Sequence, residues 1–227
     1  MLEGARLVFD ALNSSYEVET FLITESANEK YFDASVQMQR KSKNSYFISD
    51  TLSQKISETK NSQGVFAVCK MKNENISLKT NQKYIALDNL QDPGNLGTVI
   101  RTAEALGISS VIVGGGCDVF NPKVLRASMG SVLRLDVFEC QSLAPVLQKA
   151  KSLGIKTYAT SPDSSAKKIN ETQFPKSSLC VIGNEANGVS DEVMNICDET
   201  VTIPMLGRAE SLNAHVAGAI VMWEMLR

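Results

Sequence analysis

The stretch "DPGNLGTVIR" (92–101) decides how this sequence folds, because it ends one element and begins another within a few residues. It follows the strand-like run "YIALDNL" (84–90). Pro93 suits the first turn of a helix, where its missing N–H is not needed. A strand that gives way at once to a helix is the repeating unit of a parallel α/β sheet.

The helix that begins here is predicted to have one apolar face. That face is formed by residues at helical spacing, namely Leu96, Val99, Ile100, Ala103 and Leu106. Arg101 lies away from it, roughly 140° from Leu96 on a helical wheel. Asn95 is predicted to cap the helix, and Gly94 and Gly97 allow a backbone or a ligand to approach closely. Arg101 is therefore a candidate site residue, with a solvated arginine as the alternative.

From Tyr84 onward, strand-like and helical runs alternate. The strand-like runs are "YIALD", "SVIVGG", "LRLDVF", "KTYAT", "LCVIG" and "VTIP". Near-continuous apolar strands between helices predict fold class α/β, with a parallel sheet flanked by helices. Because ligands bind beyond the carboxyl ends of such strands, we expect the site at the loops after Asp88, Gly114, Thr160, Gly183 and Pro204.

The first 75 residues carry shorter elements. "GARLVFDALN" has helical spacing, and "VETFLIT", "SYFIS" and "GVFAVCKM" are strand-like. The polar run "KNENISLKTNQK" (72–83) is typical of a linker. The sequence thus predicts a small α/β domain over 1–75, a linker over 76–82 and a larger domain over 83–227.

Composition limits the classes of protein that remain. No apolar run approaches the roughly 20 residues that cross a membrane, and the acidic start "MLEGARLVFDAL" does not fit a signal peptide. The five cysteines are odd in number and never spaced as CxxC, which indicates reduced thiols with no metal cage and no disulfide frame. We therefore expect a cytoplasmic protein with no metal and no membrane partner.

The net charge of −2 gives no general sign of a nucleic-acid binder. If the partner is RNA, it must be held by local basic patches. Arg40 and Lys41 in "RKSK" (40–43) are candidate contacts, as are Lys123 and Arg126 in "NPKVLRASMGS". The alternative for each patch is a solvated surface.

A carboxylate follows the strand-like run in "VIGNEANGVSDEV" (181–193). Glu185 reads as a buried acid that could accept hydrogen bonds from a sugar or an amide, or could cap local N–H groups instead. Ser190 is a candidate helix cap. The glycines of "GGGCD" (114–118) lack the spacing of a dinucleotide or phosphate loop.

The closing segment "IPMLGRAESLNAHVAGAIVMWEMLR" (203–227) predicts an amphipathic helix. Its apolar stripe consists of Leu212, Val216, Ala219, Ile220, Trp223 and Leu226. Ser211 is a candidate cap for this helix, and Asn213 points off the stripe. His215 lies at the flank of the stripe, where it is a general base or a structural residue.

Three stretches taken together, "LDNLQDPGNLGTVIRTAEALG", "CVIGNEANGVSDEV" and "IPMLGRAESLNAHVAG", resemble the signature motifs of the SpoU (TrmH-type) RNA ribose methyltransferases of the SPOUT class. "NPKVLRASMGS" also resembles that family, and the resemblance spans 82–227. The first 75 residues, with "LEGARLVFDAL" and "SQGVFAV", resemble the small substrate-binding domain that precedes many members.

The resemblance implies a C-terminal trefoil knot and S-adenosylmethionine as cofactor. It implies cofactor contacts at Thr160, Gly183, Ile203, Met205 and Leu212. It assigns the catalytic work to Arg101, Asn95, Glu185, Ser211 and Asn213, with Arg101 acting across a homodimer. Where the family has a small residue this chain has His215, whose role stays open.

The function implied is S-adenosylmethionine-dependent 2′-O-methylation of a ribose in structured RNA, with ribosomal RNA favoured over transfer RNA. A non-catalytic RNA-binding or ribosome-assembly protein that keeps the knot is the alternative from another class. A Rossmann-type dehydrogenase is set aside, because the glycine fingerprint and its acidic ribose partner are missing.

Overall fold

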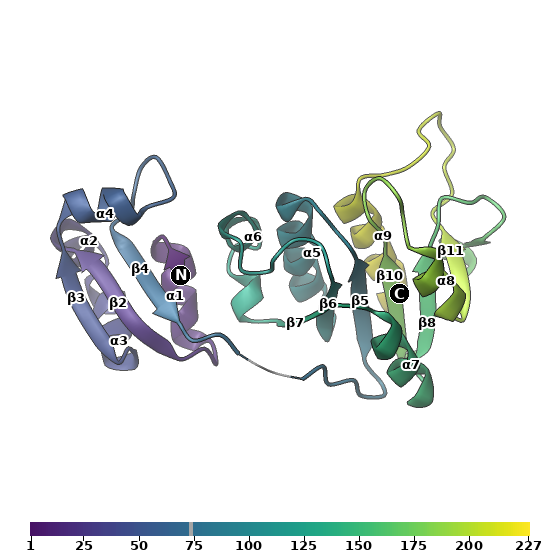
Figure 1. Ribbon diagram of the computed structural model, residues 1–227, viewed down its shortest axis with the longest axis horizontal. Helices are drawn as coiled ribbons and strands as arrows, with labels where there is room; N and C mark the ends of the chain where they lie inside the picture. The colour runs from purple at the N-terminus through teal and green to yellow at the C-terminus, as the bar shows by residue number, and fades with distance from the viewer. Residues whose placement is uncertain (73–74) are drawn as a thin grey trace. The chain divides into compact units, whose positions relative to one another are not determined.

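The computed structural model describes residues 1–72 and 75–227, and it divides into two compact units, Met1–Asn73 and Glu74–Arg227. Each unit has a sheet of its own, and each is described separately below. Figure 1 shows the elements of both units in chain order by colour.

The first unit is a small α/β fold built on a mixed sheet. Its strands are β1 (Leu2–Glu3), β2 (Val18–Thr24), β3 (Asn44–Ile48) and β4 (Val65–Cys69). Its helices are α1 (Ala5–Asp10), η1 (Ala11–Asn13), α2 (Glu25–Lys30), α3 (Phe32–Lys41) and α4 (Asp50–Ile56). The order is β1-β4-β2-β3, with β2 parallel to β3 and antiparallel to β4. The predicted strands are confirmed, whereas α2, α3 and α4 escaped the sequence analysis.

The second unit is a parallel sheet flanked by helices. Its strands are β5 (Lys83–Asp88), β6 (Ser110–Gly114), β7 (Asp136–Cys140), β8 (Lys156–Thr160), β9 (Lys167–Lys168), β10 (Ser178–Ile182) and β11 (Glu199–Thr202). Its helices are α5 (Pro93–Leu106), α6 (Pro122–Ala127), η2 (Ser131–Leu133), α7 (Ala144–Ser152), η3 (Ile169–Glu171), α8 (Asp191–Ile196) and α9 (Ala214–Leu226). The strand order is β7-β6-β5-β10-β8-β11-β9, and every pair among them is parallel.

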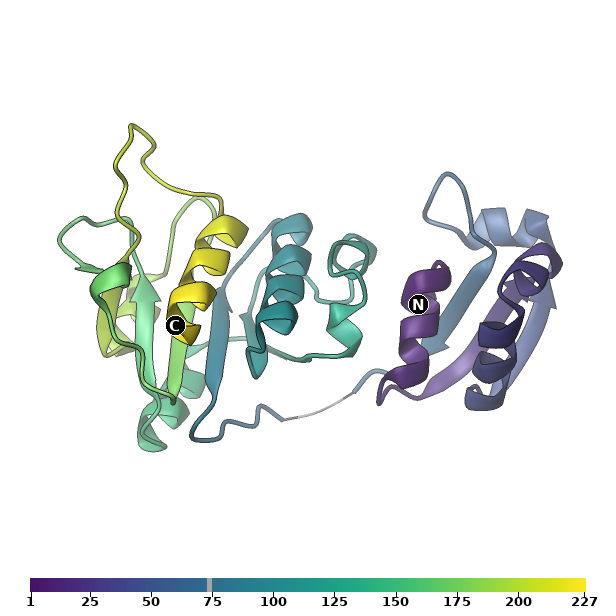
Figure 2. The same ribbon diagram turned by 180° about the vertical axis from the view of Figure 1, so that it is seen from behind.

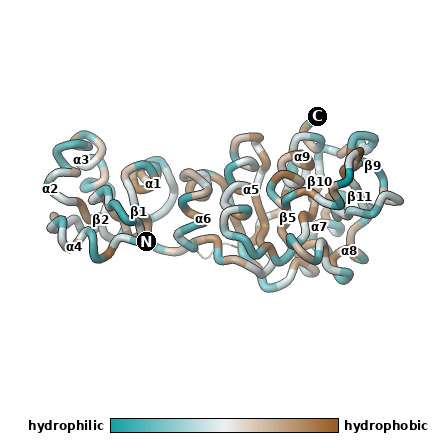
Figure 3. The backbone as a smooth tube through the Cα atoms, turned by 90° about the horizontal axis from the view of Figure 1, so that it is seen from above, coloured by the Kyte–Doolittle hydropathy of each residue, from teal (hydrophilic) through white to brown (hydrophobic). Residues whose placement is uncertain are grey.

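The parallel sheet is buried on both faces, as its apolar strands predict. Helices α5 and α9 cover one face and α7 and α8 the other (Figures 1 and 2). Tyr84 and Ala86 of β5 join the core on the α7–α8 side, so the alternation of a strand sends Ile85 and Leu87 to the α5–α9 side. Figure 3 shows brown, hydrophobic backbone around β10 and teal, hydrophilic backbone at the edge strand β9.

Residues of the predicted linker pack against the second unit. Leu78 is buried in the core of that unit, and Ile76 packs against the same core. The Tyr84 hydroxyl contacts the Lys79 backbone at both its N–H and its carbonyl. Residues 73 and 74, which belong to the polar run 72–83, lie outside the described residues.

Helix α5 begins at Pro93 with Asp92 as its cap, and the Asp92 carboxylate accepts a hydrogen bond from the Asn95 N–H at 2.8 Å. The prediction of Asn95 as the cap was wrong by three residues. An aspartate directly before a first-turn proline is itself a favourable cap, and it leaves the Asn95 side chain available for other contacts. The predicted apolar stripe is confirmed, since Leu96, Val99 and Ile100 are fully buried.

Helix α9 is apolar around its whole circumference, so the predicted amphipathic stripe was wrong. The residues buried against α5 and β10 are Ala214, Gly218, Val221, Met222 and Met225. Trp223 of the predicted stripe is 62% exposed. The Lys83 ammonium donates to the Met225 carbonyl and so holds the end of the helix to β5.

Gly97 lies at a close contact between helices α5 and α6. A Cβ built at this position would lie 2.5 Å from Ala127 Cβ and 2.7 Å from the Val124 carbonyl oxygen of α6. The backbones of α5 and α6 therefore touch only because residue 97 has no side chain.

We predict that Gly97→Ala lowers the free energy of unfolding by about 1–3 kcal/mol, because the added methyl group overpacks this contact. Urea denaturation of the purified protein measures the change. Gly207→Ala is the matched control, since a Cβ there meets nothing within 4 Å. Equal stability of the two variants would contradict the assignment.

Candidate functional site

Three loops at one edge of the parallel sheet form a pocket. They follow β8, β10 and β11, which are neighbours in the sheet, so their carboxyl ends meet. The cavity measures about 340 Å³. Its lining residues are Thr160, Ser161, Pro162, Ile182, Gly183, Asn184, Glu185, Ala186, Asn187, Gly188, Ile203, Met205, Glu210, Ser211, Leu212, Ala214 and Ala217.

The pocket brings together residues predicted from distant parts of the sequence. All five candidate cofactor residues line it, namely Thr160, Gly183, Ile203, Met205 and Leu212. Glu185 and Ser211 of the candidate catalytic set line it as well. The loop after Gly114 does not take part.

The loop after β10 is folded tightly on itself. A Cβ at Gly183 would lie 2.1 Å from the carbonyl carbon of Gly188, so no larger residue fits. Asn184 pairs with Gly188 through backbone hydrogen bonds in both directions. The Asn184 side chain accepts from the N–H groups of Ala186 and Asn187 and donates to the Asn89 carbonyl at 2.8 Å. The loop is therefore set in shape before any ligand arrives.

Glu185 joins this loop to the start of α5. Its carboxylate accepts hydrogen bonds from the backbone N–H groups of Gln91 and Asp92, each at 3.1 Å, and from the Asn95 amide at 2.9 Å. The side chain is exposed rather than buried as expected. Partial burial raises the pKa of Glu185, but the hydrogen bonds from Asn95, Gln91 and Asp92 outweigh it, so its pKa lies below the usual 4.5. Glu185 is thus an ionised acceptor at neutral pH, and the tie weakens only as the pH falls through that lowered pKa.

His215 extends the same network to α9. Its Nδ1 lies 3.1 Å from Asn95 Oδ1, and Asn95 itself is 7% exposed. A carboxylate only accepts hydrogen bonds, so the Asn95 NH₂ group must face Glu185 and its Oδ1 must face His215. His215 therefore carries a proton on Nδ1 and donates it to Asn95. No sequence pattern predicts this pair, whose two residues are 120 positions apart.

The cap of α9 is Asn213, whose side chain accepts from the His215 N–H at 2.9 Å. The prediction of Ser211 as the cap was wrong, because the helix starts two residues later and leaves Ser211 in the pocket wall. Ser190 begins α8 without a side-chain cap and instead donates its hydroxyl to Asp88 at 2.7 Å. The last contact ties the end of β5 to the loop after β10.

Arg101 lies on the exposed side of α5 and does not line the pocket. Among the described residues it has no hydrogen-bond or ion-pair partner within the chain. Trp223, Val216 and Leu226 form an exposed apolar face on the neighbouring helix α9. Within the described part of one chain, neither the Arg101 guanidinium nor this apolar face has a partner.

The candidate RNA contacts divide into two kinds. Arg40, Lys123 and Arg126 are exposed. Lys41 instead donates to the carbonyls of Ala11, Leu12 and Ser14 at 2.6–2.8 Å, which uses all three ammonium protons to close the end of α1 and η1. The structure thus gives Lys41 a structural role.

The described residues contain neither a cluster of metal ligands nor a membrane-spanning helix. Within 1–72 and 75–227, no group of three or more His, Cys, Asp or Glu side chains is placed to hold a metal ion. None of the helices in these ranges has the length and apolarity needed to cross a membrane. The arrangement offers a preformed pocket with backbone groups, apolar walls and two acidic side chains, Glu185 and Glu210.

Known proteins resemble this chain over nearly its whole length. The chain is 34% identical over 227 residues to the 23S rRNA (guanosine(2553)-2′-O)-methyltransferase RlmP of Bacillus subtilis, covering 99% of this chain and 87% of that protein. It is similar in structure to the SpoU methyltransferase AviRb from Streptomyces viridochromogenes in complex with AdoMet (TM-score 0.85, 27% identity, 99% and 88% of the two chains). It is also similar to the AdoMet-bound rRNA methyltransferase from Sinorhizobium meliloti (TM-score 0.86, 26% identity, 99% and 85%).

The two units match different family models. Residues 1–67 match the MRM3-like substrate binding domain. Residues 82–223, which include β5 to β11 and the whole pocket, match the SpoU rRNA Methylase family. The pocket-forming loops therefore lie inside the matched region, and the chain belongs to the SpoU rRNA methylase family.

Proposed function

We propose that this protein transfers a methyl group from S-adenosylmethionine to a ribose 2′-hydroxyl in structured RNA, most of all ribosomal RNA. The observation that carries the proposal is the pocket formed by the loops after β8, β10 and β11. Relatives that match nearly the whole chain are named for rRNA 2′-O-methylation or are solved with AdoMet. A cytoplasmic location and a trefoil knot in the C-terminal segment are part of the same proposal.

The pocket suits the proposed cofactor. The side chains of Ile203, Leu212 and Met205 offer apolar surface to an adenine ring and a thioether chain. Thr160 Oγ1 donates to the Val181 carbonyl at 3.0 Å, so its side chain is held at the pocket wall. Gly183 lines the pocket, and its missing side chain lets the backbone of Gly188 and Val189 pack directly against it. When bound, S-adenosylmethionine supplies a methyl group carried on a positively charged sulfur.

The remaining site residues position the acceptor ribose. Ser211 and the ionised Glu185 offer hydrogen-bonding oxygens at the pocket wall, and Asn95 and Asn213 fix the segments beside them. Arg101 cannot serve as a base, because a guanidinium stays protonated in proteins. It acts instead as a clamp for a phosphate group and for the negative charge that develops on the 2′-oxygen.

The enzyme acts as a homodimer in which Arg101 serves the pocket of the partner subunit. The exposed apolar face of α9 with Trp223 and Val216 supports this, since such a surface is covered by another protein. Arg101 is on α5, which packs beside α9, so a partner bound at that face would lie close to the guanidinium. The exposed Arg40, Lys123 and Arg126 would contact the RNA backbone.

The experiment that tests the function is methyl transfer from labelled S-adenosylmethionine to RNA of cells that lack this protein. We expect label at a single alkali-resistant linkage of ribosomal RNA, and we expect Arg101→Ala to lower the rate by about 10²-fold or more while it still binds the cofactor. Label in transfer RNA would reassign the substrate. Cofactor binding with no transfer to free RNA or to assembling subunits would support the non-catalytic RNA-binding protein.

Mixed dimers test whether Arg101 acts across the interface. Arg101→Ala and Glu185→Ala chains are each expected to be inactive alone. After the two are unfolded and refolded together, the mixed dimer would contain one complete site, and activity should return to about a quarter of the wild-type value. If Arg101 serves its own chain, every site in the mixture lacks one group and no activity returns.

His215 is predicted to position Asn95 by donating its Nδ1 proton. His215→Ser should lower kcat by up to about tenfold, because the buried Asn95 oxygen loses its donor. His215→Gln should restore most of the rate, since its amide also donates. Cofactor affinity should be the same in both variants. A serine variant with wild-type kcat would remove His215 from the account.

A further inference from the structure

The first unit contains a second cavity, of about 440 Å³, remote in sequence from the loops described above. It is lined by Thr24, Ser26, Ala27, Lys30, Tyr31, Asp50, Ser53, Gln54, Asn61, Ser62, Gln63 and Gly64. We propose that this cavity receives one unstacked nucleobase of the RNA and reads it by hydrogen bonds. The proposal rests on the proposed function, because it takes RNA as the substrate.

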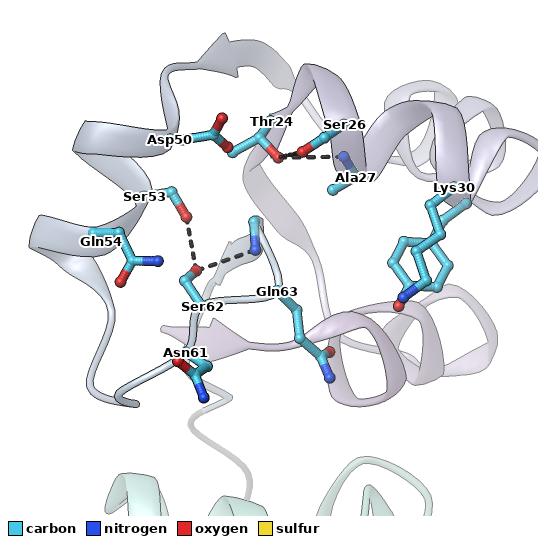
Figure 4. Close-up of a pocket in the computed structure, with 12 residues that line it drawn as sticks. Thr24, Ser26, Ala27, Lys30, Asp50, Ser53, Gln54, Asn61, Ser62 and Gln63 are labelled. Carbon is cyan, nitrogen blue, oxygen red and sulfur yellow. Dashed lines mark hydrogen bonds between the residues drawn. The ribbon is translucent and has the colours of Figure 1, made fainter.

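The wall of the cavity is held in place before any ligand binds. Ser53 of α4 and Ser62 share a hydrogen bond of 2.7 Å in this wall, and the Ser62 oxygen also accepts from the Gly64 N–H at 3.1 Å (Figure 4). Gly64 has a φ of +69°, and a Cβ there would lie 2.3 Å from Thr24 Oγ1. The cavity is therefore a built feature and not a gap between mobile loops.

Glu3 fixes the same segment from outside. Its carboxylate accepts from the Ser57 hydroxyl at 2.5 Å, the Thr59 hydroxyl at 2.8 Å and the Glu58 N–H at 3.0 Å. Burial raises the pKa of Glu3, but these hydrogen bonds outweigh it and lower the pKa. Hydrogen bonds with Glu3 and within the segment thus hold residues 57–64 at the rim without using the side-chain amides that line the cavity.

Those amides are the groups that would bind a base. Gln54 and Asn61 are exposed at the cavity and, among the described residues, their side chains have no hydrogen-bond partner. Gln63 accepts from the Ala5 N–H at 2.7 Å through its oxygen, which leaves its NH₂ group as a donor. Side-chain amides donate and accept side by side, which is what the hydrogen-bonding edge of a nucleobase requires. RNA-binding proteins read unstacked bases in this way.

Charge favours a base over a phosphate as the occupant. The lining holds one cation, Lys30, and one anion, Asp50, so the cavity itself has no excess of positive charge. Residues 1–72 as a whole contain nine basic and nine acidic side chains. A phosphate site would need a surplus of lysine or arginine, whereas a neutral base is compatible with both charges.

An aromatic side chain completes the cavity. Tyr31 lines it, with the Lys30 ammonium 5.1 Å from the centre of the ring and Phe9 in an edge contact on it. Unstacked bases commonly pack against such rings. Lys30 then lies where it can reach the phosphate attached to the bound base.

The test is equilibrium binding of the full chain to large-subunit ribosomal RNA from cells lacking this protein, measured at several salt concentrations without cofactor. We expect the double variant Gln54→Ala/Asn61→Ala to bind about tenfold or more weakly than wild type. The slope of log affinity against log salt should stay the same, because no phosphate contact is removed. Gln37→Ala, an exposed amide on α3 outside the cavity, is the matched control and should bind as wild type.

Wild-type affinity in the double variant overturns the proposal, and so does a weaker affinity that comes with a smaller salt slope, which would indicate a phosphate site. Lys30→Ala should show the opposite pattern, with a reduced slope. The outcome is separate from the proposed function. Methyl transfer to the same RNA is measured in parallel, and a chain that binds RNA through this cavity yet transfers no methyl group would refute only the catalytic proposal.

Discussion

One ionised carboxylate holds the candidate active site together. Glu185 accepts hydrogen bonds from the N–H groups of Gln91 and Asp92, directly before α5, and from the Asn95 amide. These bonds join the loop after β10 to the helix that carries Arg101. His215 adds α9 to the same network. This tie adds to the bonds from Asn184 to the Asn89 carbonyl and from Ser190 to Asp88, which hold the same loop to the end of β5. The lowered pKa of Glu185 follows from the same contacts and keeps the tie intact at neutral pH.

The parallel sheet supplies the second constraint. Because β10, β8 and β11 are adjacent, three loops far apart in the sequence reach one pocket. This placement was predictable, since apolar strands that alternate with helices indicate a parallel sheet and ligands bind at its carboxyl edge. The five expected cofactor residues lie together for that reason. Their contacts with a cofactor stay a prediction.

The failures of sequence reasoning have physical causes. A helical wheel identified the buried face of α5 because its other faces are polar, but α9 is apolar all round, and the wheel selected the face with Trp223, which is exposed. The buried face of α9 contains Gly218. A Cβ built there would lie 3.6 Å from the Val99 side chain and 3.9 Å from the Ile182 side chain. The contact of His215 with Asn95 joins α9 to α5 and depends on tertiary structure alone. Helix caps were misplaced by two or three residues, because several neighbouring polar residues could each cap the helix.

The two units divide the work in this account. The second unit holds the pocket for the cofactor, and the first unit, with nine basic and nine acidic side chains in residues 1–72, holds the amides that we propose read a base. The claim on which the rest depends is that the pocket between the three loops binds S-adenosylmethionine. Isothermal calorimetry of the full chain tests it most directly, with NAD as the control ligand. The account predicts one S-adenosylmethionine bound per chain and no binding of NAD, and a chain that binds NAD, or binds no S-adenosylmethionine, would contradict it.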